Sequence, residues 1–162
     1  MGQKSPKKTL AARCLDNLGL AYELLTYEPG PQLSAIEAAD FLSLPRAIVY
    51  KTLLLRGDRH GLLEACIPAE MELDLKTLAL VSDNKKVTMT TVKELTQLTG
   101  YLRGGCSPLG GLKSYPVYLE ESVLNQEKIA INAGARGLMF LLRPQDLALA
   151  TQATLAAIAK PI

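Results

Sequence analysis

The strongest constraint on the fold is a pair of apolar segments that flank a short polar turn. AIVYKTLLLR covers residues 47–56, GLLEACIP covers residues 61–68, and the turn GDRH lies between them. Apolar runs of this length bounded by Gly and Asp are typical of strands, and two runs joined so closely predict a β-hairpin. We therefore expect an antiparallel pair of strands near the middle of the chain.

The remaining periodicity predicts a mixture of helices and short strands. Ser34 with Glu37, and Thr91 with Glu94, have the spacing of a capping box, which marks the start of a helix. There is no regular alternation of strand and helix, so we expect an α+β fold with a mixed, curved sheet flanked by helices. Helices are predicted at 9–18, 34–44, 73–81, 91–100, 121–126 and 144–159, and further strands at 22–27, 85–89, 116–120, 128–132 and 138–142.

Composition places the chain among small globular proteins. Its 162 residues suit one domain, 1–162, in which residues 1–6 are expected to be a flexible tail. The formal charge of +2 is weak support for a nucleic-acid partner. The 3 cysteines are far apart and odd in number, which disfavours a disulfide framework or a zinc site. The chain has no apolar run long enough to span a bilayer and no signal-peptide pattern, so a cytoplasmic location is expected.

Several common catalytic devices are missing from the sequence. The only histidine, His60, lies in the predicted turn, where it is more typical of a solvated residue than of a base held against a nucleophile. There is no H-E-x-x-H motif, no Walker A loop and no G-x-G-x-x-G motif. An enzyme with this sequence would work without a Ser-His-Asp triad, and neither a metal nor a cofactor is expected.

Two features remain that could carry chemistry. Lys51 sits in the middle of a predicted strand, where an ammonium is costly unless it reaches water or an anion. The loop TGYLRGGCSPLGG, residues 99–111, contains Gly104 and Gly105, whose backbone N–H groups could bind an oxyanion or a carbonyl oxygen. Together they suit an ester or acyl substrate attached to an anionic group. The alternatives are a lysine on a solvated face and a loop that is only a turn.

At these residues the sequence resembles the YbaK/EbsC family of aminoacyl-tRNA deacylases, which is related to the editing domain of bacterial prolyl-tRNA synthetase. The resemblance is carried by VYKTLLL, LDLKTLA, TGYLRGGCSPLG and the turn ARGL with the later QDLA, in the family's order from about residue 22 to the C-terminus. It implies a small mixed β-barrel flanked by helices. It also implies an enzyme that removes wrongly attached amino acids from tRNA.

The resemblance assigns roles to individual residues. Lys51 matches the family's strand lysine, which would hold the tRNA terminus and polarise the ester. Gly105 matches the glycine whose backbone N–H would face the carbonyl oxygen, and Tyr27 would line the pocket. Thr52 is a weaker candidate, because it faces the opposite side of an ideal strand. The expected site comprises catalytic Lys51 and Gly105 with substrate-binding Tyr27, Thr52, Gly104, Ser107, Pro108, Asn132 and Arg136.

The branch that the chain resembles most clears cysteine from proline tRNA, which predicts Cys-tRNA(Pro) as the substrate. In that branch the substrate's own thiol is thought to attack the ester carbonyl, so the protein needs no nucleophile of its own. The alternatives are a deacylase for Ala-, Ser- or Thr-tRNA and a non-catalytic tRNA-binding module. Misacylated tRNA is the expected partner and prolyl-tRNA synthetase a candidate partner, with no membrane and no DNA.

The sequence also departs from the family pattern. Cys106 stands where relatives commonly carry an aliphatic residue, and it suits a pocket wall better than a nucleophile, because no base is in view. Asn132 and Ala133 replace a frequent serine-glycine pair, although Asn132 could still donate a hydrogen bond. The segment 28–35 lacks the aromatic residue that many cysteine-branch members carry. Arg136 matches the family and could contact the tRNA backbone or cap the turn.

Overall fold

The computed structural model describes residues 8–162 and confirms the α+β class. The expected flexible tail, 1–6, lies outside the described residues. The strands form a five-stranded, a three-stranded and a two-stranded sheet, all of which stay open rather than closing into a barrel. The strands are β1 (Glu23–Thr26), β2 (Tyr50–Gly57), β3 (Gly61–Pro68), β4 (Met71–Leu73), β5 (Val87–Met89), β6 (Val117–Glu120), β7 (Ile129–Ala135), β8 (Leu138–Leu142), β9 (Thr154–Ala156) and β10 (Ala159–Pro161).

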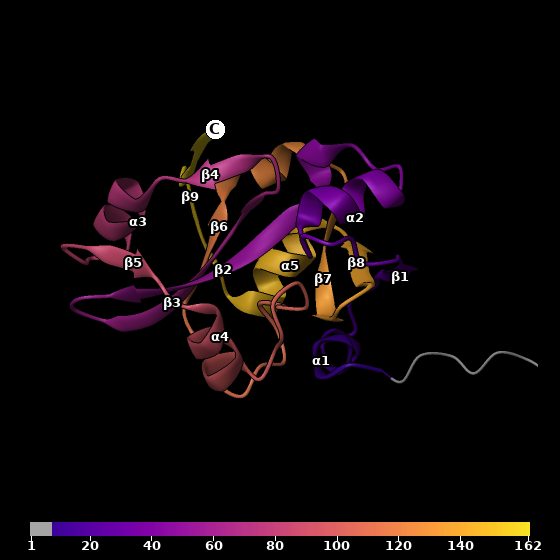
Figure 1. Ribbon diagram of the computed structural model, residues 1–162, viewed down its shortest axis with the longest axis horizontal. Coiled ribbons are helices and arrows are strands. Elements are labelled where there is room, and N and C mark those ends of the chain that lie inside the picture. Colours follow the sequence, from indigo (N-terminus) through magenta and orange to yellow (C-terminus); the bar gives the residue numbers. More distant parts are fainter. Residues whose placement is uncertain (1–7) are drawn as a thin grey trace, which may run out of the picture.

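Short helices surround the sheets. Strand β2 crosses the middle of the molecule, with α2 and the β1-β8-β7 sheet at one end and α3 with β5 at the other (Figure 1). The predicted capping box of Ser34 and Glu37 is present at the start of α2, and the Thr91 side chain caps α4. The helices are α1 (Leu10–Asn17), α2 (Ala35–Phe41), η1 (Arg46–Ile48), α3 (Leu75–Val81), α4 (Val92–Thr99), η2 (Glu121–Asn125) and α5 (Pro144–Thr151).

The predicted hairpin is the centre of the five-stranded sheet. Strands β2 and β3 pair antiparallel along their whole length, from Tyr50 opposite Pro68 to Gly57 opposite Gly61. Asn84 Oδ1 accepts hydrogen bonds from the backbone N–H groups of Arg59 and His60 and so holds the hairpin turn. His60 is exposed there, as expected for a turn residue.

The other edge of β2 changes partner along its length. At its start, Val49 forms a parallel bridge with Ala130 of β7. From Leu55 onward, β2 pairs antiparallel with β5. Residues 50–54 have no strand partner on this edge among the described residues. The strand therefore leaves one sheet and joins another, and we call residues 50–54 the split edge of β2.

The predicted C-terminal helix over 144–159 is wrong in its second half. Helix α5 ends at Thr151, because Gln152 adopts a left-handed backbone conformation with φ of 53° and caps it. The chain then forms β9, which pairs parallel with β6, and β10, which pairs antiparallel with β4. Apolar and alanine-rich residues fit both periods, so the available sheet edges decided the outcome.

Two smaller differences concern β4 and β7. The sequence did not predict β4, a strand of three residues. Strand β7 continues through the turn expected at 133–137 as far as Ala135, with a bulge between Asn132 and Ala135. The described cysteines are free thiols. No helix within residues 8–162 is long and apolar enough to cross a bilayer.

One buried charge-bearing group lies in the central hairpin. Glu64 on β3 is only 4% exposed, and its Oε2 has no hydrogen-bond partner among residues 8–162. Burial raises the pKa of Glu64 to about 7. The nearby Cys66 and Cys106 have thiol pKa values that burial raises further above neutrality, and the hydroxyl of Tyr101 behaves likewise. Glu64 is therefore the group of this cluster that changes charge near neutral pH.

We expect Glu64 to make folding stability fall as the pH rises. Its pKa in the folded state is above the ordinary 4.5, so the folded protein holds a proton that the unfolded chain releases. Stability should decline between these two pKa values, by about 3 kcal/mol in total, and stay level above them. Chemical unfolding from pH 4.5 to 8 should show this decline in the wild type and a smaller one in Glu64→Gln. The exposed Glu127→Gln is the control, and parallel curves for Glu64→Gln and wild type would contradict the assignment.

Candidate active site at the split edge of strand β2

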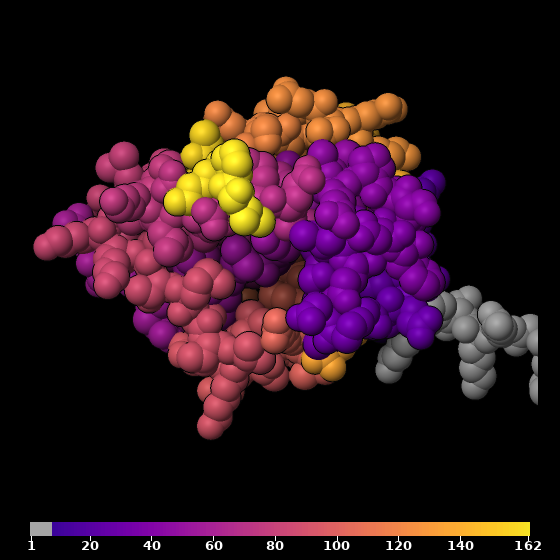
Figure 2. Space-filling model, turned by 45° about the horizontal axis from the view of Figure 1, so that its top comes forward, coloured from indigo at the N-terminus to yellow at the C-terminus, as the bar shows by residue number. Residues whose placement is uncertain are grey.

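A cavity of about 370 Å³ opens at the split edge of β2. The space-filling view shows the molecule hollowed where the indigo N-terminal part meets the middle of the chain (Figure 2). The lining residues come from the start of α2, the split edge, the loop after α4 and strands β7 and β8. They include Tyr27, Gln32, Ser34, Lys51, Thr52, Arg103, Gly104, Cys106, Asn132, Met139 and Ile162.

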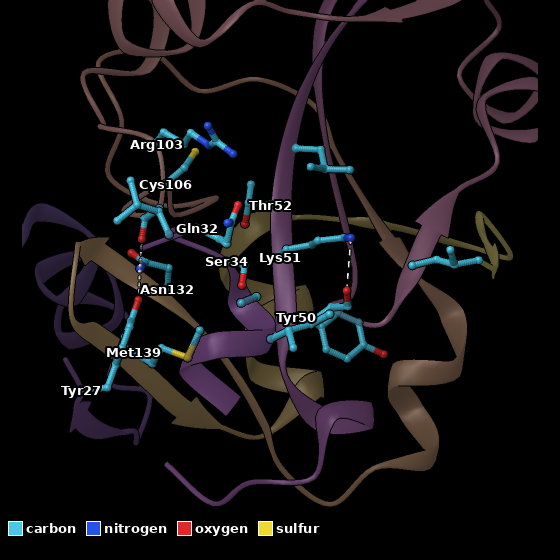
Figure 3. A pocket seen from close by; sticks show the side chains of 17 residues that line it. Tyr27, Gln32, Ser34, Tyr50, Lys51, Thr52, Arg103, Cys106, Asn132 and Met139 are labelled. Carbon is cyan, nitrogen blue, oxygen red and sulfur yellow. Dashed lines mark hydrogen bonds between the residues drawn. The ribbon is translucent and has the colours of Figure 1, made fainter. Parts of the chain in front are cut away.

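Lys51 and Thr52 reach the cavity from opposite faces of β2. Lys51 lies opposite Ile67 and Thr52 lies opposite Cys66, which places their side chains on different sides of the β2–β3 sheet. Figure 3 shows Lys51 and Thr52 pointing to either side of the strand. Both line the cavity, because it lies at an edge of β2 that no neighbouring strand covers. The expectation that they face opposite sides is confirmed. Both side chains nevertheless line the same cavity.

The Lys51 ammonium is half-buried and incompletely satisfied. Its Nζ donates one hydrogen bond, to the carbonyl oxygen of Ala69 at 3.2 Å. An ammonium has three N–H donors, so two remain for a ligand or water. Burial lowers the pKa of Lys51, and the nearby Glu72 carboxylate opposes this shift. A cation held in a partly dry cavity interacts more strongly with a developing negative charge than one in water does.

The glycine loop lies against the cavity, but only one of its two glycines lines it. Gly104 lines the cavity with φ of +81°, and a Cβ there would lie 2.9 Å from the Cβ of Leu33. A side chain at 104 is therefore disfavoured by both backbone conformation and space. The N–H of Gly105 donates to the carbonyl of Leu102 at 2.9 Å, so in this conformation it is already used inside the loop. The N–H of Gly104 has no such acceptor among the described residues.

Asn132 fixes the loop to the sheet. Its amide nitrogen donates to the carbonyl oxygens of Gly104 at 2.9 Å and Ala135 at 3.1 Å, and lies 3.5 Å from the Tyr27 hydroxyl. Its Oδ1 accepts from the N–H groups of Gly134 at 2.7 Å and Ala135 at 3.2 Å. The side chain is 8% exposed. Its donors and acceptor are thus occupied by the protein, which makes Asn132 a residue that shapes the cavity.

Cys106 forms part of the cavity wall. The side chain is 8% exposed, and burial, with a further contribution from Glu64, raises the pKa of its thiol to about 12. The thiol therefore stays protonated near neutral pH, which suits a wall residue and disfavours a protein nucleophile. Met139 also contributes a sulfur atom to the lining, at a separate place in the cavity (Figure 3).

Besides Gly105, three expected site residues are absent from the lining of this cavity. The Ser107 hydroxyl accepts from the N–H of Leu109 within the loop. Pro108 lines a separate cavity of about 640 Å³. Arg136 is exposed, and its Nε donates to the carbonyl oxygen of Arg103 at 2.8 Å, which fits the turn-fixing alternative. Several lining residues were not predicted as site residues, among them Gln32, Ser34, Arg103, Met139 and Ile162.

Sequence patterns could have indicated some of these residues. The capping box marked Ser34 as the start of a helix, but nothing showed that this helix end faces the cavity. Arg103 stands in the glycine loop beside Gly104 and could have been included with it. Ile162 could not be found, because its position depends on β9 and β10, and a helix was predicted over 144–159 instead.

We expect Asn132→Ala to loosen the cavity wall without unfolding the protein. The substitution removes the acceptor of the Gly134 and Ala135 N–H groups and the donor to Gly104. Removing one partner of buried hydrogen bonds costs about 1–3 kcal/mol. Hydrogen exchange should show faster exchange at Gly134 and Ala135, whereas the exposed Asn125→Ala should leave both rates unchanged. Unchanged exchange rates at Gly134 and Ala135 in Asn132→Ala would show that the turn keeps its structure without the Asn132 side chain.

Comparisons with known proteins identify the family of this chain. Residues 30–149 match the family model described as the aminoacyl-tRNA editing domain. EbsC of Enterococcus faecalis, described as a candidate Cys-tRNA(Pro)/Cys-tRNA(Cys) deacylase, is 38% identical over 146 residues, which cover 90% of this chain and 89% of that protein. The resemblance to the YbaK/EbsC family is thereby confirmed.

Solved structures agree with the family at the level of the fold. A candidate trans-editing enzyme for prolyl-tRNA synthetase superposes with a TM-score of 0.80 and 25% identity, covering 98% of this chain and 99% of the other. The hypothetical protein APE2540 superposes with a TM-score of 0.85 and 22% identity over 93% of this chain and 99% of its own, which shows a shared fold. With its family model matched over residues 30–149, the chain belongs to the aminoacyl-tRNA editing domain family.

Proposed function

We propose that the protein is a free-standing deacylase that removes a wrongly attached amino acid from tRNA, and that its main substrate is Cys-tRNA(Pro). The observation that carries the proposal is the half-buried Lys51 ammonium, which lines a cavity of about 370 Å³ and donates one protein hydrogen bond. An ester carbonyl placed beside it would gain most stabilisation when its oxygen becomes negative. The description of the relative EbsC supports the same substrate class.

The proposed reaction uses the substrate's own thiol. The cysteine sulfur attacks the carbonyl carbon of its ester and forms a C–S bond, and the carbonyl oxygen becomes an oxyanion. The C–O bond to the ribose then breaks, the thiol proton ends on the ribose hydroxyl, and the products are a cysteine thiolactone and free tRNA. The protein contributes orientation and charge stabilisation and no covalent bond.

Two donors hold the oxyanion in this proposal. Lys51 offers two N–H groups beyond the one that binds Ala69. The second donor comes from the Gly104–Gly105 backbone, as the family resemblance implies. The N–H of Gly104 is available without rearrangement, whereas the N–H of Gly105 must first leave the carbonyl of Leu102. Tyr27 and Thr52 contact the substrate as lining residues.

The proposed mechanism favours cysteine over the alternative amino acids. Met139 and Cys106 each contribute a sulfur atom to the lining, and a thiol packs well against such polarisable groups. Alanine would fit, but it carries no nucleophile, so water or a tRNA hydroxyl would have to attack. A deacylase for Ala-, Ser- or Thr-tRNA is therefore the second candidate. A non-catalytic tRNA-binding module, in which Lys51 would only hold an anion, is the third.

The proposal includes misacylated tRNA as the partner and prolyl-tRNA synthetase as a possible source of tRNA selectivity. The net charge of +2 is small for a protein that must select one tRNA alone. A synthetase that binds proline tRNA could deliver the substrate to this protein. We also propose a cytoplasmic location, where this substrate is made.

We expect Lys51→Met to abolish deacylation while leaving the fold at least as stable. Loss of one oxyanion donor costs about 100-fold or more in rate. The same substitution removes a partly desolvated ammonium, so the unfolding temperature should stay level or rise. The measurement is deacylation of Cys-, Ala-, Ser- and Pro-tRNA(Pro), with thermal unfolding in parallel.

The matched control is Lys128→Met, which removes an exposed lysine and should retain wild-type activity. We expect the wild type to release cysteine from its tRNA and none of the other amino acids, and we expect this release to depend on Lys51. Release of alanine or serine from tRNA would instead support the second candidate function. A folded Lys51→Met variant with full activity would refute the role of Lys51.

A further inference from the structure

The lining of the cavity at the split edge carries cations but, among the described residues, no carboxylate side chain. Its lining residues, all within 8–162, include two cations, Lys51 and Arg103, and no aspartate or glutamate. Three other arginines, Arg46, Arg56 and Arg59, pair with carboxylates on the surface. The Arg103 guanidinium is exposed and forms no ion pair within the part of the chain that the structure describes.

The backbone that carries Arg103 is held firmly. Three consecutive carbonyl oxygens of the loop accept hydrogen bonds: that of Leu102 from Gly105, that of Arg103 from Arg136, and that of Gly104 from Asn132. The Arg103 side chain itself makes no hydrogen bond to another of residues 8–162. In the close view Arg103 extends beside Cys106, at the end of the cavity beyond Thr52 (Figure 3). A guanidinium that extends from a fixed backbone, with its N–H donors unused by the described residues, is available to bind an anion at this end of the cavity.

The chemistry of the proposed substrate identifies this anion. The aminoacyl ester has no carboxylate, and its amino group carries a positive charge. The adenine and the ribose of the terminal nucleoside are neutral. The nearest negative charge to the ester is therefore the phosphodiester on the 5′ side of the terminal adenosine. With Lys51 at the ester, a second cation in the same cavity matches the next charged group along the RNA.

We propose that Arg103 binds the phosphodiester that joins the terminal adenosine to the rest of the tRNA. This inference rests on the proposed function and adds a binding residue to it. A guanidinium can contact two phosphate oxygens at once and so fixes both position and orientation. Arg103 thereby supplies binding energy that holds the ester beside Lys51, and it takes no part in bond making or breaking.

The test compares two substrates that differ in this phosphate. One is Cys-tRNA(Pro), and the other is 3′-O-cysteinyl-adenosine, which carries the same ester and no phosphate. Arg103→Ala should lower kcat/KM for the tRNA about 10-fold or more and leave kcat/KM for the nucleoside ester unchanged. Arg103→Lys should retain part of the effect, because it keeps the charge and loses the bidentate geometry. Arg143→Ala, an exposed arginine outside the cavity lining, is the control.

A binding measurement makes the test independent of activity. The dissociation constant of uncharged tRNA should rise in Arg103→Ala, and its dependence on salt should weaken by about one phosphate contact. An equal fall in activity on both substrates would overturn the proposal, because Arg103 would then act at the ester or on the loop. Unchanged tRNA binding would also overturn it. Failure of the wild type to cleave either ester would defeat the proposed function, while the binding data would still decide the role of Arg103.

Discussion

The site depends on the pairing of strand β2, which differs between its two edges. One edge is bonded to β3 from end to end, and this fixes the strand in the centre of the core. The other edge meets β7 at Val49 and β5 from Leu55, and residues 50–54 lie between these contacts. A strand held so firmly on one side can leave part of its other edge open without losing its place. The cavity forms in that gap, and it can therefore be lined from both faces of one strand.

The energetic cost of the site is concentrated in Lys51. Burial lowers the pKa of this lysine, and one carbonyl, that of Ala69, is its hydrogen-bond partner in the described structure. A group that is costly in the resting protein is useful when the substrate supplies the missing negative charge. The surrounding residues keep this arrangement rigid, since Asn132 and Arg136 fix consecutive carbonyls of the glycine loop. The hydrogen-bonded loop thus lines the same cavity as the partly desolvated ammonium of the strand.

Local signals in the sequence were sufficient where a side chain acts on its own backbone. The capping residues Ser34 and Thr91 and the turn between β2 and β3 were predicted correctly, because each depends on neighbours within a few residues. The end of α5 was not predicted correctly, because β9 and β10 form by pairing with the edges of β6 and β4, which are distant in sequence. Lys51 was found from its unusual place in a strand. The hydrogen bond that occupies the Gly105 N–H, and the exposure of Arg103 to the cavity, depend on tertiary contacts that no local pattern reveals.

The central claim is that the protein supplies charge and orientation while the substrate supplies the nucleophile. The most direct measurement is the identity of the first product of a single turnover with Cys-tRNA(Pro), stopped within milliseconds to seconds and analysed by mass spectrometry. We expect cysteine thiolactone to appear together with free tRNA, and free cysteine to follow only as the thiolactone hydrolyses. Free cysteine formed from the first time point with no thiolactone would contradict the claim and require water, activated within this cavity, as the nucleophile.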